Sequence, residues 1–180
     1  MAVVVLKLFS NTVISIEDGI LLLLAHSFVF LALFICIGSV IYDKTDTRII
    51  NYIRGFVTYM PVFTILFLIF TLANTSILLT LNWLDEQLSL IGIWQQNPIV
   101  ACLGVTGIAL SNYSLFLYNR LSYGNLSTYL PPLKNINRRE YYLLITLLIP
   151  TVVFGILPNA LLGPMHISVS SLLYNIPWIN

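Results

Sequence analysis

Long runs without formal charge are the feature that most limits how this chain can fold. Residues 98–118 and 141–162 contain no Asp, Glu, Lys or Arg, and residues 20–42 contain His26 but no full charge. A helix needs about 20 apolar residues to cross the hydrocarbon core of a bilayer. Charged residues form only 8% of the 180-residue sequence, compared with about 25% in soluble domains. The sequence therefore predicts an all-α membrane protein.

Residues 55–94 form an apolar run about twice as long as one membrane pass requires. A straight helix of this length would extend about 60 Å, against a hydrocarbon core of about 30 Å. Its only charges belong to Asp85 and Glu86. Either the chain forms a hairpin that turns at these carboxylates, or one pass is broken and holds them inside the membrane.

The basic residues discriminate between these two arrangements. Seven of the eight Lys and Arg residues lie within residues 44–54 and 120–139. The positive-inside rule places both loops on the same side of the membrane, so an even number of passes must separate them. A single broken pass over residues 55–94 satisfies this condition, whereas a hairpin does not.

The sequence thus predicts four transmembrane passes and a half-pass, which form one membrane domain over residues 1–180. The passes cover residues 20–42, 55–94, 98–118 and 141–162, and the second is a discontinuous helix. Residues 1–10 are apolar apart from Lys7 but would extend only about 15 Å as a helix. We therefore expect them to form half a pass.

Glu86, Asp85 and His26 are the candidate functional residues, because they are ionisable groups inside the predicted passes. A charge within the bilayer costs roughly 2.5–3.5 kcal/mol on insertion scales, so such a group is usually paired or functional. Burial of Glu86 beside Asp85 would bring its proton exchange nearer to neutral pH, as a proton relay requires, with Asp85 as a modulator. An unperturbed histidine ring has a pKa of about 6.5, which suits His26 to proton transfer. The simpler alternatives are a surface carboxylate at a turn and a hydrogen-bonded core histidine.

The remaining ionisable groups in apolar segments are expected at the membrane surface. Lys7 is expected to extend its ammonium group to the nearby interface. Glu17 and Asp18 are expected in a loop on the face opposite to the basic loops, and His166 is expected at the same interface. Pro61 is expected in the first turn of a helix, where its missing N–H costs nothing.

No cofactor or metal is expected to bind to this chain. Cys36 and Cys102 lie in apolar runs without C-x-x-C spacing, so we interpret both as small core side chains rather than disulfide or zinc residues. No glycine-rich phosphate-binding motif and no nucleophile elbow is present. The net charge of +1 provides no basic stripe for nucleic acid, which leaves membrane lipids and other membrane proteins as the expected partners.

A set of segments matches the motifs of one known family. The run LKLFSNTVISIEDGILLLLAHSFVFLALFICIGSVIYDKTDTR is similar to the pattern LFSN-x-GIEG-LL-LAHG-ALF-G-YDR-TR. MPVFTILFLIFTLAN is similar to MP-x-F and FFTLAN, YSLFLYNRLSYGNLS to YSLWLYNR and FGNL, NINRREYYLL to LNRRE, and MHISVSSLL to MH-x-SV-x-xLL. The matches follow one another in order over nearly the whole chain. The chain therefore resembles the C-terminal third of subunit 4 of NADH dehydrogenase (ubiquinone), an antiporter-like membrane-arm subunit of respiratory complex I.

This resemblance implies a discontinuous helix that holds a carboxylate midway across the membrane. The family carries this carboxylate in a PGT-x-x-F-x-GEF segment, and LLTLNWLDEQ occupies the same register here. Glu86 aligns with the family's glutamate, and His26 aligns with the histidine of its AHG motif. The sequence departs from the family at the break, where Leu78 and Leu79 replace Pro-Gly, and at Asp85, which replaces a glycine.

The implied function is proton translocation coupled to NADH:ubiquinone oxidoreduction. The resemblance implies no redox chemistry in this chain itself, because NADH, FMN, iron–sulfur clusters and ubiquinone would bind to other subunits of the complex. The expected partners are other complex I membrane subunits, above all a separate chain that supplies the N-terminal two thirds. The expected location is the mitochondrial inner membrane, with a bacterial inner membrane as the second choice.

Two alternatives remain at this stage. A multisubunit cation/proton antiporter has the same implied fold and would use Glu86 without any quinone. The motifs YDKTDTR and NRRE favour complex I over this reading. The other alternative is a purely structural membrane subunit whose channel does not conduct protons, for which loss of the Glu86 carboxyl group would have no effect on pumping.

The charge distribution predicts the topology. Cysteines introduced at positions 44 and 138 are expected to react with a membrane-impermeant thiol reagent from the same compartment, because both basic loops obey the positive-inside rule. A cysteine at position 97 should react from the other compartment. Labelling of positions 44 and 138 from opposite sides would contradict the broken-pass interpretation.

Overall fold

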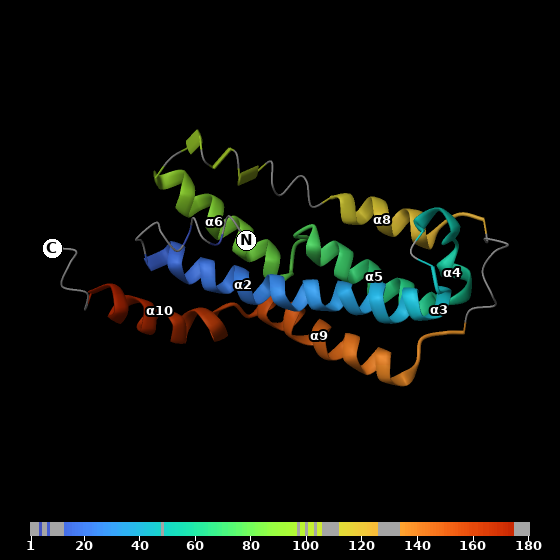
Figure 1. The fold of residues 1–180 in the computed structure, drawn as a ribbon. Helices are drawn as coiled ribbons and strands as arrows, with labels where there is room; N and C mark the ends of the chain where they lie inside the picture. Colours follow the sequence, from blue (N-terminus) through green and yellow to red (C-terminus); the bar gives the residue numbers. More distant parts are fainter. Residues whose placement is uncertain are drawn as a thin grey trace.

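The computed structural model describes residues 4, 7, 13–47, 49–96, 98–99, 101–102, 104–105, 112–125 and 134–174. In this part of the chain, helices are the only regular elements. The prediction of an all-helical chain is therefore confirmed. In chain order (Figure 1) the elements are α2 (Val13–Phe34), η1 (Ile35–Tyr42), α3 (Asp43–Thr45), η2 (Ile50–Tyr52), α4 (Phe56–Tyr59), α5 (Pro61–Asn74), α6 (Leu81–Gln96), α8 (Tyr113–Ser122), α9 (Arg138–Ile156) and α10 (Asn159–Tyr174).

Helix α2 continues through η1 and α3, so one helical run extends from Val13 to Thr45. Its η1 segment is a π-helix, in which each N–H donates to the carbonyl five residues earlier instead of four. The predicted pass began at residue 20, and the surface loop predicted for Glu17 and Asp18 is wrong. Both residues lie inside α2 and are buried, because each has a basic partner within the bundle.

The run predicted as a pass over residues 141–162 is divided between α9 and α10. Helix α9 begins with a capping box in which Asn137 and Glu140 exchange side-chain and backbone hydrogen bonds. It ends before Pro158, as expected from the steric restriction that proline places on the preceding residue. The residues after 162, which no predicted pass covers, belong to α10, which lies alongside the first half of α2 (Figure 1).

Helices α5 and α6 are separated by the non-helical residues 75–80, here called the α5–α6 break. Helix α5 begins at Pro61, as predicted. Within the break, Ser76 and Leu79 both adopt left-handed backbone conformations, with φ of 58° and 74°. The chain does not turn back at Asp85 and Glu86, since both lie within α6. Figure 1 shows α5 and α6 following one another along α2, from the end that holds α3 and α4 to the opposite end.

Helix α9 packs its C-terminal turn directly against the α5–α6 break. A Cβ atom added at Gly155 would lie 2.8 Å from the carbonyl carbon of Thr80 and 2.9 Å from the nitrogen of Leu81, and closer still to the carbonyl oxygen of Leu79. Real side chains do not approach backbone atoms so closely. Glycine is therefore the residue that allows α9 to support the break.

The two basic loops lie at the same end of the bundle. The ammonium group of Lys44, in α3, is 3.4 Å from a carboxylate oxygen of Glu140 in α9. It also donates to the backbone carbonyl of Asn135 at 3.2 Å. This contact confirms that the loops around Lys44 and Arg138 share one end. Arg48 and Asn97, which also entered the topology argument, lie outside the described residues.

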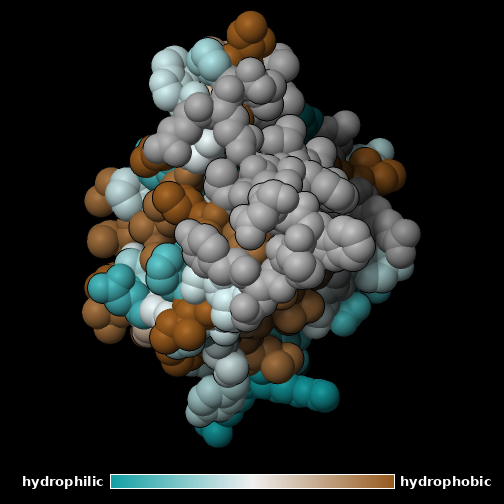
Figure 2. Space-filling model, turned by 90° about the vertical axis from the view of Figure 1, so that its left-hand side faces the viewer, coloured by the Kyte–Doolittle hydropathy of each residue, from teal (hydrophilic) through white to brown (hydrophobic). Residues whose placement is uncertain are grey.

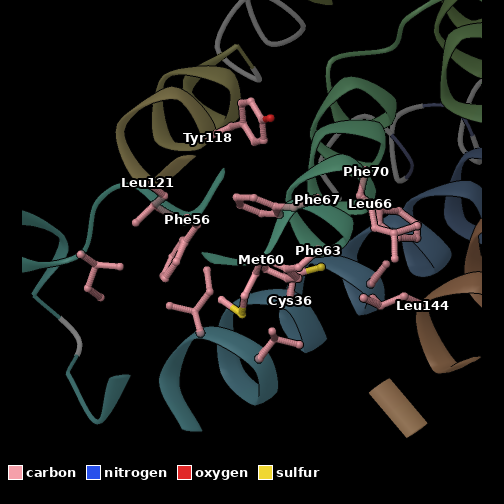
Figure 3. Close-up of a cluster of buried hydrophobic side chains, with 14 residues drawn as sticks. Cys36, Phe56, Met60, Phe63, Leu66, Phe67, Phe70, Tyr118, Leu121 and Leu144 are labelled. Atoms are coloured by element: carbon pink, nitrogen blue, oxygen red, sulfur yellow. The ribbon is translucent and has the colours of Figure 1, made fainter. Parts of the chain in front are cut away.

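An apolar core joins α2 and η1 to α4, α5, α8 and α9 near the basic end (Figure 3). Phe63 and Phe67 of α5 lie nearly parallel, with ring centroids 5.7 Å apart, and Phe56 of α4 meets Phe63 edge to face. Cys36 is buried in this core as predicted. Cys102 is exposed, contrary to the prediction, and presents its small apolar side chain to the outside of the bundle.

The outside of the bundle is also rich in apolar side chains. Figure 2 shows them around the periphery of the described surface when the bundle is seen end-on, from the side of α10 and the start of α2. Phe34, Phe116 and Ile167 expose 64%, 68% and 72% of their surface. By length and composition, Val13–Thr45 and Arg138–Ile156 are able to cross a membrane, and Pro61–Asn74 is a shorter apolar helix.

The contact between α9 and the α5–α6 break predicts that Gly155→Ala destabilises the protein. The added methyl group must displace backbone atoms of the break, and overpacking of this kind costs typically 1–3 kcal/mol. We expect a lower midpoint of thermal denaturation for the purified membrane assembly and a lower assembled amount. Gly163→Ala is the matched control, because nothing lies within 4 Å of its added Cβ, and it should retain the wild-type midpoint. Equal behaviour of the two variants would contradict this packing.

Candidate functional site

Asp85 and Glu86 lie in the second turn of α6, immediately after the α5–α6 break. Asp85 is completely buried and Glu86 is half-buried. Neither carboxylate lies at a surface turn, which was the simpler alternative for Glu86. Helix α6 packs against α2, α5 and α9, so the helical register directs Asp85 into the bundle and leaves Glu86 beside the break.

Polar groups of the break surround this part of α6. The side-chain amide of Asn82 donates to the backbone carbonyl of Ala73 at 3.1 Å and so connects α6 to the end of α5. The hydroxyl of Thr80 donates to the carbonyl of Ile77 at 2.7 Å. The Ser76 hydroxyl of the break is buried near the Glu86 carboxyl group, but it forms no hydrogen bond with the described residues. A broken helix leaves backbone groups without helical partners, and the side chains of Asn82 and Thr80 replace some of the lost interactions.

Lys7 and Asp18 form a buried ion pair that the sequence analysis did not predict. The Lys7 ammonium nitrogen is 2.6 Å from a carboxylate oxygen of Asp18, and each side chain exposes only 1% of its surface. The expectation that Lys7 extends to the membrane surface is therefore wrong, because a partner of opposite charge lies within reach inside the bundle. Lys7 also interacts electrostatically with Asp85 and Glu86, and Asp18 interacts with Asp85.

A second pair links Glu17 of α2 to His166 of α10. The ring nitrogen Nδ1 of His166 lies 2.7 Å from a carboxylate oxygen of Glu17. The His166 side chain is exposed, as its predicted interfacial position implies, whereas Glu17 is largely buried. This contact was missed because α10 itself was not predicted. The opposite signs of Lys7 and Asp18, each in an apolar segment, were a signal for the ion pair that the sequence already contained.

His26 lies on α2, two helical turns beyond Asp18, and is half-buried. Its ring packs on Phe30, with ring centroids 4.8 Å apart. Within the described ranges, no hydrogen bond or ion pair joins His26 to Asp85 or Glu86. The structure therefore brings the two acids together with Lys7 and Asp18, while His26 lies further along α2.

The described part of the chain contains no group of three His, Cys, Asp or Glu side chains arranged to hold a metal ion. The chemistry that the acid cluster can support is proton exchange. A buried carboxyl group near a second carboxylate and a lysine can bind and release a proton as its surroundings change.

The matching sequence family is described as NADH:quinone oxidoreductase/Mrp antiporter, transmembrane, and the match covers residues 1–111. NADH-ubiquinone oxidoreductase chain 4 of Mycosarcoma maydis is 50% identical over 176 residues, which are 97% of this chain and 36% of that protein. The protein of the same name from Marchantia polymorpha is 40% identical over 171 residues, or 94% of this chain and 34% of that protein. This chain thus spans about a third of the length of the curated relatives that it matches.

The fold is also similar to a solved chain in the structure titled "Respiratory complex I from Thermus thermophilus with bound NADH". The TM-score is 0.83, the sequence identity is 24%, and the match covers 95% of this chain and 37% of that chain. At this identity the likeness shows that the two chains share a fold. The resemblance noted in the sequence is therefore supported by the family match and the relatives, and the solved structure supports the fold.

The hydrogen bond from Asn82 to Ala73 predicts that Asn82→Ala loosens the α5–α6 break. The Ala73 carbonyl then keeps only backbone donors of the break, such as the Ser76 N–H at 3.2 Å, and loss of the side-chain hydrogen bond costs about 0.5–1.5 kcal/mol. Hydrogen–deuterium exchange should become faster at residues 75–80. Thr146→Ala is the matched control, because it removes a side-chain-to-backbone hydrogen bond within α9, away from the break. Unchanged exchange in Asn82→Ala would show that other contacts hold the break.

Proposed function

We propose, on the premise that this chain belongs to the NADH:quinone oxidoreductase/Mrp antiporter transmembrane family, that it forms part of a proton-translocating subunit of respiratory complex I. The observation that carries the proposal is the position of Glu86, half-buried and directly after a helix break inside an apolar bundle. The curated relatives named NADH-ubiquinone oxidoreductase chain 4 support the same assignment.

In this proposal α5 and α6 form one broken membrane pass. The α2–η1–α3 run is the pass before it, α8 belongs to the pass after it, and α9 is the fourth. Residues 1–10 would form half a pass, although only Val4 and Lys7 of this segment are described. The shared end of the two basic loops supports this arrangement, because the α5–α6 run leaves that end and α8 returns to it (Figure 1).

Glu86 is the proposed proton carrier, with Asp85 as its modulator and His26 as a relay further along the bundle. A non-helical segment within a membrane is tolerated where it is buried in protein or lines a wet cavity. The polar side chains of Ser76, Thr80 and Asn82 give the α5–α6 break this character. Protons would reach Glu86 through the break and leave it toward the face of the bundle at the α10 end.

The redox reaction would take place in other subunits, which would hold NADH, FMN, iron–sulfur clusters and ubiquinone. In this chain, the ionisable groups would bind and release protons in response to changes transmitted through neighbouring membrane subunits. The curated relatives carry two further thirds of sequence beyond the part that this chain matches. The proposed subunit requires that part as well, either in the same polypeptide or as a separate partner chain.

The proposed location is the mitochondrial inner membrane. The relatives named above come from Mycosarcoma maydis and Marchantia polymorpha, both eukaryotes. A bacterial inner membrane is the second choice, because a chain of similar fold occurs in respiratory complex I from Thermus thermophilus. A cation/proton antiporter is the second candidate function, because the family description itself includes Mrp antiporters.

Glu86→Gln is the central test of the proposal. Glutamine keeps the volume of the side chain and most of its hydrogen bonding but cannot carry a proton in the same way. Proton translocation driven by NADH oxidation should fall about 100-fold or more per assembled complex, the typical scale for loss of a positioned proton-transfer group. Glu86→Asp should be milder, because it retains a carboxyl group with a shorter reach. The measurement is proton uptake into membrane vesicles, normalised to the complex content.

Asp46→Asn is the matched control, because it removes a carboxylate from an exposed turn at the basic end. Asparagine tolerates the left-handed conformation of this residue, so pumping should stay at the wild-type rate. If Glu86→Gln pumps normally, and Asp85→Asn and the double variant do as well, neither carboxylate takes part and the chain is a structural subunit. Pumping that requires Na⁺ and no quinone would instead identify an antiporter.

A further inference from the structure

Lys7, Asp18 and Asp85 form a buried charge cluster, and the proposed role of Glu86 as proton carrier does not explain this cluster. Lys7 and Asp18 are in direct contact at 2.6 Å, and both are almost completely shielded from solvent. Asp85 interacts electrostatically with both residues and with its neighbour Glu86. The three residues come from separate segments of the chain, namely the N-terminal segment, α2 and α6, so the fold brings them together.

Asp85 differs from the other members of this cluster because its charge is not compensated. Both oxygens of the Asp85 carboxyl group are buried, and neither accepts a hydrogen bond from the described residues. A buried ion without a partner is strongly destabilised, because it has lost its hydration. The charge of Asp85 can be neutralised in two ways, by a proton or by the ammonium group of Lys7.

Lys7 is the only described lysine or arginine at this end of the bundle, since the other described ones lie at the basic end. It is committed to Asp18 in the observed arrangement. As long as this ion pair persists, Asp85 must take a proton to become neutral. Release of Lys7 from Asp18 would let the ammonium group pair with Asp85 instead, and Asp85 would then remain a carboxylate.

We propose that the Lys7–Asp18 ion pair keeps Asp85 available to exchange a proton with Glu86. Lys7 and Asp18 are then positioning residues, which act through the charge of Asp85. In the exchange step the O–H bond of the Glu86 carboxyl group breaks, an O–H bond forms on Asp85, and the negative charge moves to Glu86. The inference rests on the proposed function, because it assigns these residues to the same proton path.

The other titratable groups around this cluster are few. Helix α2 also brings Glu17, which is paired with His166 of α10, and His26, which packs on Phe30. Helix α5, and the half of α9 that reaches the break, contain no Asp, Glu, His, Lys or Arg. Lys7 and Asp18 are therefore the charges best placed to control Asp85.

Asp18→Asn tests the inference through the pH profile of proton pumping. Without Asp18, Lys7 pairs with Asp85 and stabilises its charged form. Asp85 then loses its proton at lower pH, and the decline of pumping on the alkaline side should move about one pH unit downward, the scale expected for a nearby opposite charge. The double variant Lys7→Met/Asp18→Asn removes both charges and should reverse most of this shift. The measurement is proton uptake per assembled complex from pH 6 to pH ~9 in vesicles.

Asp43→Asn is the matched control, because it makes the same change at an exposed position near the other end of the same helical run, and it should keep the wild-type profile. A purely structural ion pair would lower the amount of complex in Asp18→Asn without moving the profile of the complexes that assemble, and this result would overturn the inference. A double variant that keeps the full shift would overturn it as well.

Glu86→Gln is measured in parallel. If it pumps normally, the proposed function fails, whereas if it is inactive and Asp18→Asn shows no shift, only the inference fails.

Discussion

The need to neutralise charge without water determines the arrangement of this protein. Lys7, Asp18 and Asp85 are all almost completely buried, yet ions of this kind are stable in an apolar bundle only where they have partners. Lys7 holds the N-terminal segment to α2 through Asp18, and its ammonium group also attracts the Asp85 carboxyl group on α6. The N-terminal segment, α2 and α6 are therefore connected at one place, near the α5–α6 break.

The same requirement applies to the backbone at the break. Helix ends leave carbonyl and N–H groups without intrahelical partners, and in an apolar environment these groups must be satisfied locally. Asn82 reaches back from α6 to the Ala73 carbonyl, and Gly155 allows α9 to pack closely over residues 79–81. The break is thus held by contacts from both its own flanks and a neighbouring helix. This support keeps the position of Glu86 fixed relative to the bundle, which the proposed proton transfer would require.

The parts of the fold that depend on composition and charge were predictable from the sequence. Apolar runs indicated the helices, and the clustered basic residues indicated that the loops at Lys44 and Arg138 share an end. The Lys7–Asp18 pair was not predicted, because a lysine near the end of an apolar segment usually extends to the surface and one sequence contains no distances. Helix α10 was missed since Gly163 and Pro164 favour an irregular segment, although contacts with α2 stabilise the helix there. Whether Glu86, Asp85 and His26 carry protons stays a prediction.

The π-helical segment η1 has a consequence for the rotational phase of the longest helix. Each residue of an α-helix turns the chain by about 100°, and a π segment is wound less tightly. Asp18 faces α6 near one end of this helical run, and Lys44 faces Glu140 near the other end. The η1 segment lies between them and therefore sets the angle about the helix axis between these two faces. Loss of one residue from Ile35–Tyr42 would leave every pairwise contact chemically possible but rotate one end relative to the other. The two ends of the bundle could then no longer engage their partners at the same time.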